Sequence, residues 1–464
     1  MLNFESIEIK DSEIYKKLAA KDNNISCENA FANLIVWQPL YNNMLAVEDG
    51  TLFIKSGTNE NERFRIPIGN DIKTAVGKIF DYCGDRKPKF FVQEGERLER
   101  FKSAFPNDFV FIENRDSFDY LYDREKLATL EGKKYHSKRN HIASFSKKYD
   151  WKYQKITKEN IDAVKLCAKE WYKENAERFD KYMACEKDGI ELLLNNMDEL
   201  SILGGAVTVG EKVVAFTLAS KINDEAVDIH IEKALKDYGE AYTVINREFA
   251  KNELSSFKYI NREDDLGLAG LRKAKLSYKP ERLIKKYLCV TREEYEKDKA
   301  DCFKIYNEAF EADEPFDKAL FNYCFKYCRY LKEDNRVVSM LFELPCEIIG
   351  KDFVKDAFYI YAVATDKEYR NRGYMTKLLK NVFQNNSGFL FLRPKSKATE
   401  EYYKRQGFHS IYGVTDGEEE FTVKLKDGYK ELFENTVNDI IERKFTLMTL
   451  SDDVKGLRFD YSME

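Results

Sequence analysis

The sequence predicts an α/β (α+β) protein of three units, each a mixed, twisted sheet flanked by helices. Its 464 residues suffice for about two to four domains. Helix-like and strand-like hydrophobic patterns alternate along the chain. The second and third units also share one order of elements: two helices, a hairpin, a strand, a turn, a helix, a strand and a helix. We therefore expect units at residues 1–125, 126–288 and 291–464.

The first unit shows a helix followed by a strand pair. Residues 30–56 begin as an apolar helical stretch and continue as two strands around a turn at Glu48-Asp49-Gly50. Residues 88–94 and 108–113 are apolar runs of strand length, and residues 70–82 between these groups suit a helix. The pattern indicates an α+β or α/β unit that ends near residue 125.

The second unit carries a strong hairpin signal. Two β-rich runs flank Val209-Gly210-Glu211-Lys212, which has the composition of a tight turn. The other expected elements are helices at 135–149, 157–178 and from Gly239 through Phe249, and strands at 225–234 and 257–260.

The third unit repeats that order with its own lengths. The expected helices cover 293–310, 316–328, 373–384 and 398–406, and the expected strands cover 329–332, 336–344, 358–365, 388–393 and a last run after Gly407.

Composition narrows the class of protein. The chain is 43% hydrophobic and 34% charged, which is typical of a globular protein with substantial cores. It contains no run of about 18 apolar residues, and its first residues lack a secretory signal, so we expect no stable membrane insertion and a cytoplasmic location. The nine cysteines form no CxxC pair and are expected to be reduced. His136 and His141 have no third ligand nearby, so we expect no metal site.

Positive charge gathers in two islands of an otherwise acidic chain. The formal net charge is −5, yet residues 132–158 carry +8 and residues 272–286 carry +6. Such islands would hold a phosphate-rich partner, or they are solvated helix faces.

The turn before the expected helix at 373–384 has the features of a phosphate site. A helix N-terminus presents unpaired backbone N–H groups and partial positive charge. Gly373 removes the side chain where contact would be closest, and Arg370 and Arg372 add positive charge. Upstream, the strand edge at residues 361–364 would pair with an extended ligand arm that carries amides, as pantetheine does.

This spacing resembles the acetyl-CoA signature of the GNAT (Gcn5-related N-acetyltransferase) superfamily, [RQ]-x-x-G-x-[GA]. The segment ATEEYYKRQGF at 398–408 also matches that superfamily's helix-then-GF ending. The resemblance implies that Tyr403 is the catalytic tyrosine, which protonates the departing CoA thiolate. Met375 departs from the pattern, which prefers Gly or Ala at that position. The implied residues for binding acetyl-CoA, or another short acyl-CoA, are Val363, Ala364, Arg370, Arg372, Gly373, Met375 and Thr376.

The first 288 residues resemble a second family. The segments at 132–142, 230–234, 241–250 and 259–280 resemble the DUF2156 group, which is related to the C-terminal domain of bacterial phosphatidylglycerol lysyltransferases. Members of this group are two GNAT-like subdomains in tandem, so the resemblance implies three GNAT-like units in the whole chain. The lysyltransferases move an aminoacyl group from aminoacyl-tRNA to a lipid headgroup.

Charged residues of the second unit gather where the expected strands end. Glu232, Glu263 and Asp265, with Arg272 and Lys275, would hold the amino group and ester of an aminoacyl moiety, or they are ion pairs that close the domain. Lys138, Arg139 and Asn140 would meet the phosphates of a tRNA acceptor end, or they are part of a basic helix in solvent.

Three functions follow from these observations. The first is acetyl-CoA-dependent N-acetylation of a small-molecule or peptide amine by residues 291–464, with the backbone N–H groups of Val363 and Ala364 polarising the thioester carbonyl. The second is aminoacyl-tRNA-dependent transfer by residues 1–288 to a lipid or a soluble acceptor. The third is a non-catalytic ligand sensor or scaffold.

Overall fold

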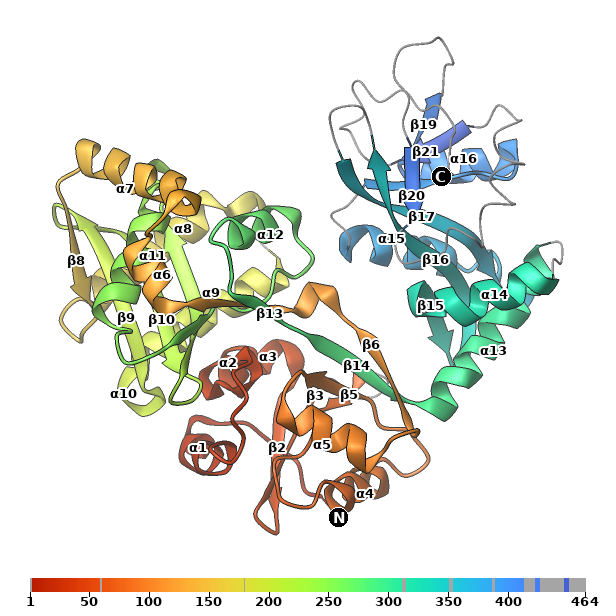
Figure 1. Ribbon diagram of the computed structural model, residues 1–464, viewed down its shortest axis with the longest axis horizontal. Helices are drawn as coiled ribbons and strands as arrows, with labels where there is room; N and C mark the ends of the chain where they lie inside the picture. The colour runs from red at the N-terminus through yellow and green to blue at the C-terminus, as the bar shows by residue number, and fades with distance from the viewer. Residues whose placement is uncertain are drawn as a thin grey trace. The chain divides into compact units, whose positions relative to one another are not determined.

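The computed structural model describes residues 2–58, 61–178, 180–310, 314–349, 354–385, 389–412, 422–425 and 446–449. The chain divides into two compact units (Figure 1). The first comprises Met1–Leu266 and Gly270–Arg292, and the second comprises Gly267–Ala269 and Glu293–Glu464. We call them the N-terminal unit and the C-terminal unit.

The first sheet of the N-terminal unit is mixed, and one of its inner strands comes from the C-terminal end of that unit. Its strand order is β1-β2-β3-β4-β5-β14-β6. The strands are β1 (Glu5–Ser6), β2 (Met44–Glu48), β3 (Thr51–Ser56), β4 (Arg63–Phe64), β5 (Phe90–Gln93), β6 (Phe109–Glu113) and β14 (Lys286–Thr291). Because β14 inserts between β5 and β6, residues far apart in the sequence complete one sheet.

Helices cover both faces of this sheet. One face packs on α4 (Ile72–Cys83) and α5 (Glu96–Ala104), around Phe53, Phe64 and Phe90. Asp71 caps α4 by accepting the backbone N–H of Thr74 at 3.1 Å. The other face packs on α1 (Ser12–Ala19) and α2 (Phe31–Val36), which α3 (Gln38–Tyr41) follows.

The second sheet has the strand order β13-β7-β12-β11-β10-β9-β8. The strands are β7 (Asp119–Asp123), β8 (Trp151–Lys155), β9 (Ile202–Val209), β10 (Lys212–Lys221), β11 (Ala226–Ala234), β12 (Tyr259–Asn261) and β13 (Arg282–Ile284). Only β11 and β12 are parallel neighbours. The hairpin of β9 and β10 confirms the turn predicted at 209–212.

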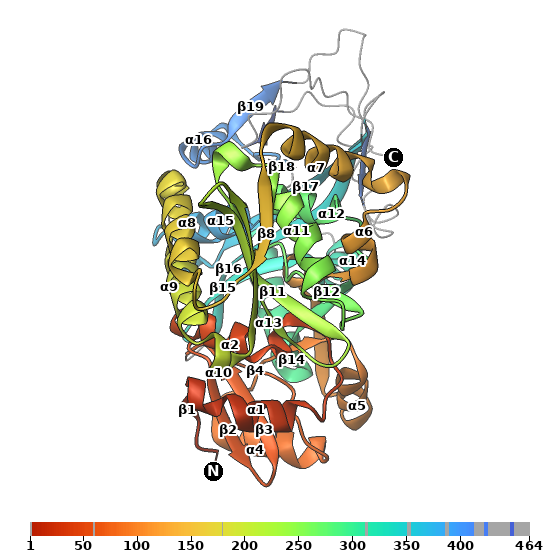
Figure 2. The same cartoon turned by 90° about the vertical axis from the view of Figure 1, so that its left-hand side faces the viewer.

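Figure 2 shows this sheet between two groups of helices. One side carries α8 (Ile161–Glu174) and α9 (Lys181–Asn195), whose apolar residues join the core shared with the first sheet. The other side carries α6 (Arg124–Thr129), α7 (His136–Lys148) and α11 (Ala241–Asn252). The short helices α10 (Met197–Leu200) and α12 (Ala269–Leu276) complete the unit's connections.

The C-terminal unit contains the third sheet, with the order β15-β16-β17-β18-β21-β19 and β20 paired to β16. The strands are β15 (Cys328–Glu333), β16 (Arg336–Ile349), β17 (Val354–Thr365), β18 (Phe389–Leu392), β19 (His409–Tyr412), β20 (Thr422–Leu425) and β21 (Thr446–Thr449). One face packs on α13 (Arg292–Ala309) and α14 (Glu314–Cys324). The other packs on α15 (Tyr374–Asn385) and α16 (Lys397–Arg405).

The structure confirms the predicted fold class, since three mixed sheets are each flanked by helices. The helices and strands predicted from hydrophobic pattern are present, with ends shifted by a few residues. The elements that the pattern missed include α1, α5, α6, α9 and α12 and the strands β7, β8, β13 and β14. The domain boundaries at 125 and 288 stay a prediction, although β7 lies before the first of them and already pairs within the second sheet.

Candidate functional site

The third sheet opens where two parallel strands stop pairing. β17 and β18 pair from Ala357 to Ile360, opposite Phe389 to Leu392, and β17 continues beyond that point to Thr365. A bulge accompanies this change, because Ala362 and Val363 together lie opposite Leu341 alone. Ala362 has a φ of 50°, in the left-handed region. We call this place the C-terminal branch point.

The backbone of Val363 and Ala364 is therefore paired on one side only within the described strands. Met340 pairs with Ala364 and Ser339 pairs with Thr365, both from β16. On the β18 side, the pairing has already ended at Leu392. An extended ligand with amide groups can add to such an edge by backbone hydrogen bonds.

Helix α15 begins directly after this edge. Gly373 precedes its first residue with a φ of 83°, and no atom lies within 4 Å of the position that a Cβ would take. The backbone is therefore open to a close approach, and the first-turn N–H groups of the helix have no partners within it. Arg370 and Arg372 are exposed beside this turn. The Arg370 Nε donates to the Thr365 carbonyl at 3.1 Å, and the Arg372 guanidinium lies 5.1 Å from the Tyr369 ring centre.

Met375 does not obstruct this turn. Its side chain packs against the apolar cluster between the sheet and α15, with its sulfur 4.0 Å from the Ser339 Oγ. The Thr376 hydroxyl lies 3.2 Å from the Tyr402 hydroxyl, which links the first turn of α15 to α16. Sequence reasoning missed Tyr402, because neighbouring tyrosines on one helix cannot be ranked without knowing which face is buried.

Tyr403 is almost fully buried, at 7% exposure, in the cluster between the sheet, α15 and α16. Its ring centre lies 5.4 Å from that of Tyr402 and 5.6 Å from that of Phe408. Burial raises the pKa of the Tyr403 phenol above its usual value, so the hydroxyl keeps its proton at neutral pH. The protonated form is the one that a general acid requires.

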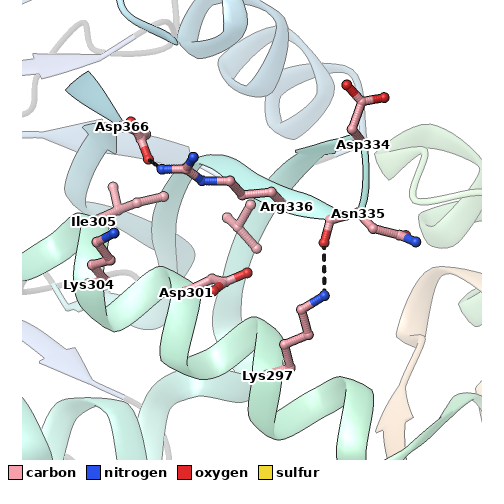
Figure 3. A pocket seen from close by; sticks show the side chains of 9 residues that line it. Lys297, Asp301, Lys304, Ile305, Asp334, Asn335, Arg336 and Asp366 are labelled. Carbon is pink, nitrogen blue, oxygen red and sulfur yellow. Dashed lines mark hydrogen bonds and ion pairs between the residues drawn. The ribbon is translucent and has the colours of Figure 1, made fainter. Parts of the chain in front are cut away.

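A cavity of about 300 Å³ lies between α13 and the turn that joins β15 to β16 (Figure 3). Lys297 donates to the Asn335 carbonyl at 3.3 Å. Arg336 pairs with Asp366 at 2.6 Å and with Glu368 at 3.1 Å. These ion pairs anchor the segment that leads from β17 to Arg370, so the cavity adjoins the turn that positions the candidate phosphate site.

The second sheet opens in the same manner. β11 and β12 pair in parallel from Ala226 to Asp228, opposite Tyr259 to Asn261, and β11 continues to Ala234. His230 is an extra residue in β11, because Ile229 and Ile231 face consecutive residues of β10. We call this place the N-terminal branch point. Bulges of this kind redirect side chains next to functional sites.

A charged cluster lies beyond the N-terminal branch point. Glu232 pairs with Arg262 at 2.7 Å and accepts from Asn246 Nδ2 at 3.0 Å. The Arg262 guanidinium lies 4.9 Å from the Tyr278 ring centre, and the Lys138 ammonium lies 3.7 Å from the same ring. Burial, and to a lesser extent the positive charge of Arg262, lowers the pKa of Lys138 to about 8. The structure thus brings Glu232 together with Lys138 from α7.

Arg272 and Lys275 both contact the loop of residues 262–265, which contains Asp265. Arg272 holds the fully buried Asp265 with two hydrogen bonds of 2.9 Å. Lys275 donates to the carbonyls of Arg262 and Asp264, at 2.5 Å in the first case. These contacts fix the path of residues 262–265, as the ion-pair alternative expects.

The remaining predicted residues of the N-terminal unit lie on α7 and at the N-terminal branch point. Arg139 and Asn140 are exposed on α7; Arg139 donates to the carbonyls of Leu130 and Gly132, the latter at 2.7 Å. Asn140 lies 3.4 Å from His136. Glu263, by contrast, is turned toward His230, with 3.5 Å between the Glu263 Oε1 and the His230 Nδ1.

Sequence reasoning missed a buried cluster centred on Lys286. The Lys286 Nζ lies 2.5 Å from both Asp119 and Glu28 and is itself fully buried. Asp119 also accepts from Ser26 at 2.7 Å and from Asn261 at 3.0 Å. These residues come from four distant segments, so no local pattern indicates that they meet.

Two known protein families match the two parts of the chain that contain these branch points. Residues 23–290 match the family described as "Phosphatidylglycerol lysyltransferase, C-terminal", and residues 291–411 match "Acetyltransferase (GNAT) domain". The chain therefore carries acyltransferase-type domains, a class whose reactions require an acceptor substrate. Because the first match spans more than half of the chain, the protein belongs to the phosphatidylglycerol lysyltransferase C-terminal family. Both resemblances drawn from the sequence are confirmed.

Relatives were found among solved structures and curated proteins. A conserved protein of unknown function from Bacteroides thetaiotaomicron is 35% identical, with a TM-score of 0.59, and the match covers 63% of this chain and 100% of that one. The uncharacterized protein MYCGA3080 of Mycoplasmoides gallisepticum is 28% identical over 198 residues, which are 42% of this chain and 62% of that relative's length. L-PGS from Bacillus licheniformis is 13% identical, with a TM-score of 0.44 over 62% of this chain and 92% of that one.

Within the described ranges, every helix is too short or too polar to pass through a bilayer.

Proposed function

We propose that the C-terminal unit transfers an acetyl group, or another short acyl group, from CoA to an amine. The observation that carries this proposal is the C-terminal branch point, where a one-sided strand edge leads within ten residues to an open helix N-terminus. GNAT domains generally bind acyl-CoA, and residues 291–411 match such a domain.

Five of the predicted residues have a role in this proposal. The edge at Val363 and Ala364 pairs with the amides of the pantetheine arm, and its N–H groups polarise the thioester carbonyl. The first turn of α15 holds the pyrophosphate, with Arg370 and Arg372 supplying charge. The acceptor nitrogen attacks the carbonyl carbon and gives up a proton to water, the C–S bond breaks, and Tyr403 gives its proton to the thiolate. The Tyr403 phenolate then regains a proton from water, so amide and free thiol are the products.

A turnover assay tests this reaction. The full-length protein is mixed with acetyl-CoA and a panel of small and peptide amines, and release of free thiol is followed. Tyr403→Phe is expected to lower kcat about 10²-fold with little change in KM, because it removes the proton donor but not the binding groups. Tyr323→Phe, on an exposed part of α14, is the matched control.

Two outcomes count against the proposal. Full turnover by Tyr403→Phe would remove Tyr403 from the reaction. Binding of acetyl-CoA without turnover on any amine would favour the ligand-sensor alternative.

A second candidate function belongs to the N-terminal unit, which shares its family with phosphatidylglycerol lysyltransferases. The Glu232–Arg262 pair at the N-terminal branch point favours it, because a carboxylate beside cations suits the amino group and ester of an aminoacyl donor. Lys138 lies at that pair, and Arg139 and Asn140 extend from the same helix toward solvent.

This function predicts binding of aminoacyl-tRNA, followed by aminoacyl transfer to a lipid headgroup at a bilayer surface or to a soluble acceptor. Binding should weaken steeply as salt rises, because phosphate contacts release counterions. Lack of RNA binding even at low ionic strength would contradict it. Arg139→Ala should reduce the salt slope by about one unit if Arg139 contacts a phosphate.

A further inference from the structure

The N-terminal branch point contains three side chains that converge without a cation. Asp228 is fully buried, and neither of its carboxylate oxygens has a hydrogen-bond partner among the described residues. The His230 side chain is 3% exposed, and its Nδ1 likewise lacks a hydrogen bond. Glu263 is the third member, and one ligand atom from each of the three lies within 4.8 Å of the others.

The Lys286 cluster nearby differs from these three side chains, because its carboxylates have a cation. Asp119 and Glu28 share the buried ammonium of Lys286, and Asn261 and Ser26 donate to Asp119. Their charges are therefore compensated within the fold. Among the described residues, no lysine or arginine lies within ion-pair distance of Asp228 or Glu263. An uncompensated buried carboxylate is costly, so this cluster calls for a cation.

The distances from His230 to the two carboxylates point to the kind of cation. The His230 Nδ1 lies 3.3 Å from the Asp228 Oδ2 and 3.5 Å from the Glu263 Oε1. Tetrahedral coordination at about 2.0–2.2 Å separates ligand atoms by about 3.3–3.6 Å. An ammonium group at hydrogen-bond distance from all three would separate them by about 4.6 Å. The imidazole ligand also disfavours calcium and magnesium, which prefer oxygen.

Neighbouring groups contact two of the three side chains. The Ser220 Oγ lies 2.8 Å from the His230 Nε2. In the tautomer that carries its proton on Nε2, Ser220 accepts that proton and the lone pair is left on Nδ1 for a metal. Asn33 Nδ2 donates to the Glu263 Oε1 at 2.8 Å, and Glu263 has a φ of 55°, which is strained for a side chain of this size. Ligand and supporting group are thus paired as in known metal sites.

We propose that Asp228, His230 and Glu263 bind a divalent transition-metal ion of the zinc class, with the fourth position left to water or to a substrate group. The site goes beyond both proposed reactions and departs from our expectation, from sequence alone, that the chain has no metal site. Sequence reasoning did not find this site, because the three ligands lie on β11 and in the loop after β12 and form no recognisable spacing.

The test is a metal-binding measurement on the full-length protein. After removal of metal with a chelator, the protein is equilibrated with ZnCl₂ and its bound zinc is counted by mass spectrometry. We expect one zinc per chain that is lost in Asp228→Asn and in His230→Gln. Ser220→Ala, which removes only the support of the imidazole, should weaken binding about 10-fold. His136→Gln, on the exposed face of α7, is the control for adventitious binding.

A second measurement needs no variant. Saturating ZnCl₂ should raise the midpoint of thermal unfolding of the N-terminal unit, and Co²⁺ in its place should give the visible absorption of a tetrahedral site. Equal zinc content in the wild type and Asp228→Asn, or an unchanged unfolding midpoint, would overturn the proposal. Asp228 would then carry a proton rather than a metal.

Discussion

The two branch points share a backbone geometry but differ in their chemistry. At both, a bulged central strand continues beyond the end of its parallel neighbour. The N-terminal branch point contains the charged groups Glu232, Arg262 and Glu263. The described part of the C-terminal branch point presents Val363 and Ala364. The same opening therefore suits a charged aminoacyl donor in one unit and an uncharged pantetheine arm in the other.

The helices that follow β11 and β17, which are α11 and α15, differ in the charges that lie beside their N-termini. Glu240 precedes α11 as its N-cap residue, and its carboxylate pairs with Lys148 at 2.8 Å, so an acidic side chain lies beside the positive end of this helix. α15 begins after Gly373, with exposed arginines beside it. The start of α15 therefore offers an anion more positive charge than the start of α11 does.

The largest expected effect concerns stability at the N-terminal branch point. Glu232→Ala leaves the Arg262 guanidinium nearly buried and unpaired, so the free energy of unfolding of the N-terminal unit should fall by about 3 kcal/mol. Urea unfolding measures the change. The double variant with Arg262→Met should recover part of the loss, and a loss below about 0.5 kcal/mol would mean that the pair is in effect solvated.

The next effect concerns binding at the C-terminal branch point. Arg370→Ala should weaken acetyl-CoA binding by about 1–3 kcal/mol, because a charge-assisted hydrogen bond to phosphate is lost. Calorimetric titration measures it, with Arg405→Ala on the exposed end of α16 as the control. Unchanged affinity would exclude Arg370 from the site.

Matched glycine substitutions sharpen the comparison of the two helix starts. Gly373→Ala places a side chain at a φ of 83° and should destabilise the C-terminal unit by about 1–2 kcal/mol. Gly239 has a φ of −55°, and an added Cβ meets its nearest atom at 3.7 Å. Gly239→Ala should therefore raise the stability of the N-terminal unit by about 0.4–1 kcal/mol. Thermal unfolding that shows the same sign for both would contradict this account.

The last prediction is a pH dependence at Lys138, whose half-exposed side chain is partly screened by solvent. Its pKa is about 8 in the folded protein, below the value of 10.5 for a free lysine. Between these values the unfolded chain binds more protons, so stability should rise as pH rises from 8 toward 10.5. Lys138→Met should remove this rise and stabilise the protein at neutral pH. Parallel pH curves for the wild type and the variant would show that Lys138 is solvated.

Hydrophobic period and turn composition predicted most elements of the fold. The hairpin at 209–212 and the strand–turn–helix around Gly373 are local, so their residues signal them directly. The strand β14 and the Lys286 cluster could not be predicted, because their partners lie in other segments. The bulge at His230 is likewise set by pairing with β10. At the site, glycine and arginine spacing indicated the C-terminal branch point, whereas the positions of Lys138 and Tyr402 depend on tertiary packing.

The central claim is that CoA binds at the C-terminal branch point and not at the N-terminal one. Titration of acetyl-CoA into the full-length protein by calorimetry tests it most directly, in the wild type and in the Arg370→Ala and Glu232→Ala variants. The account predicts one site per chain with micromolar affinity, weakened by Arg370→Ala and unchanged by Glu232→Ala. Absence of binding, or binding that Glu232→Ala abolishes while Arg370→Ala leaves it intact, would contradict it.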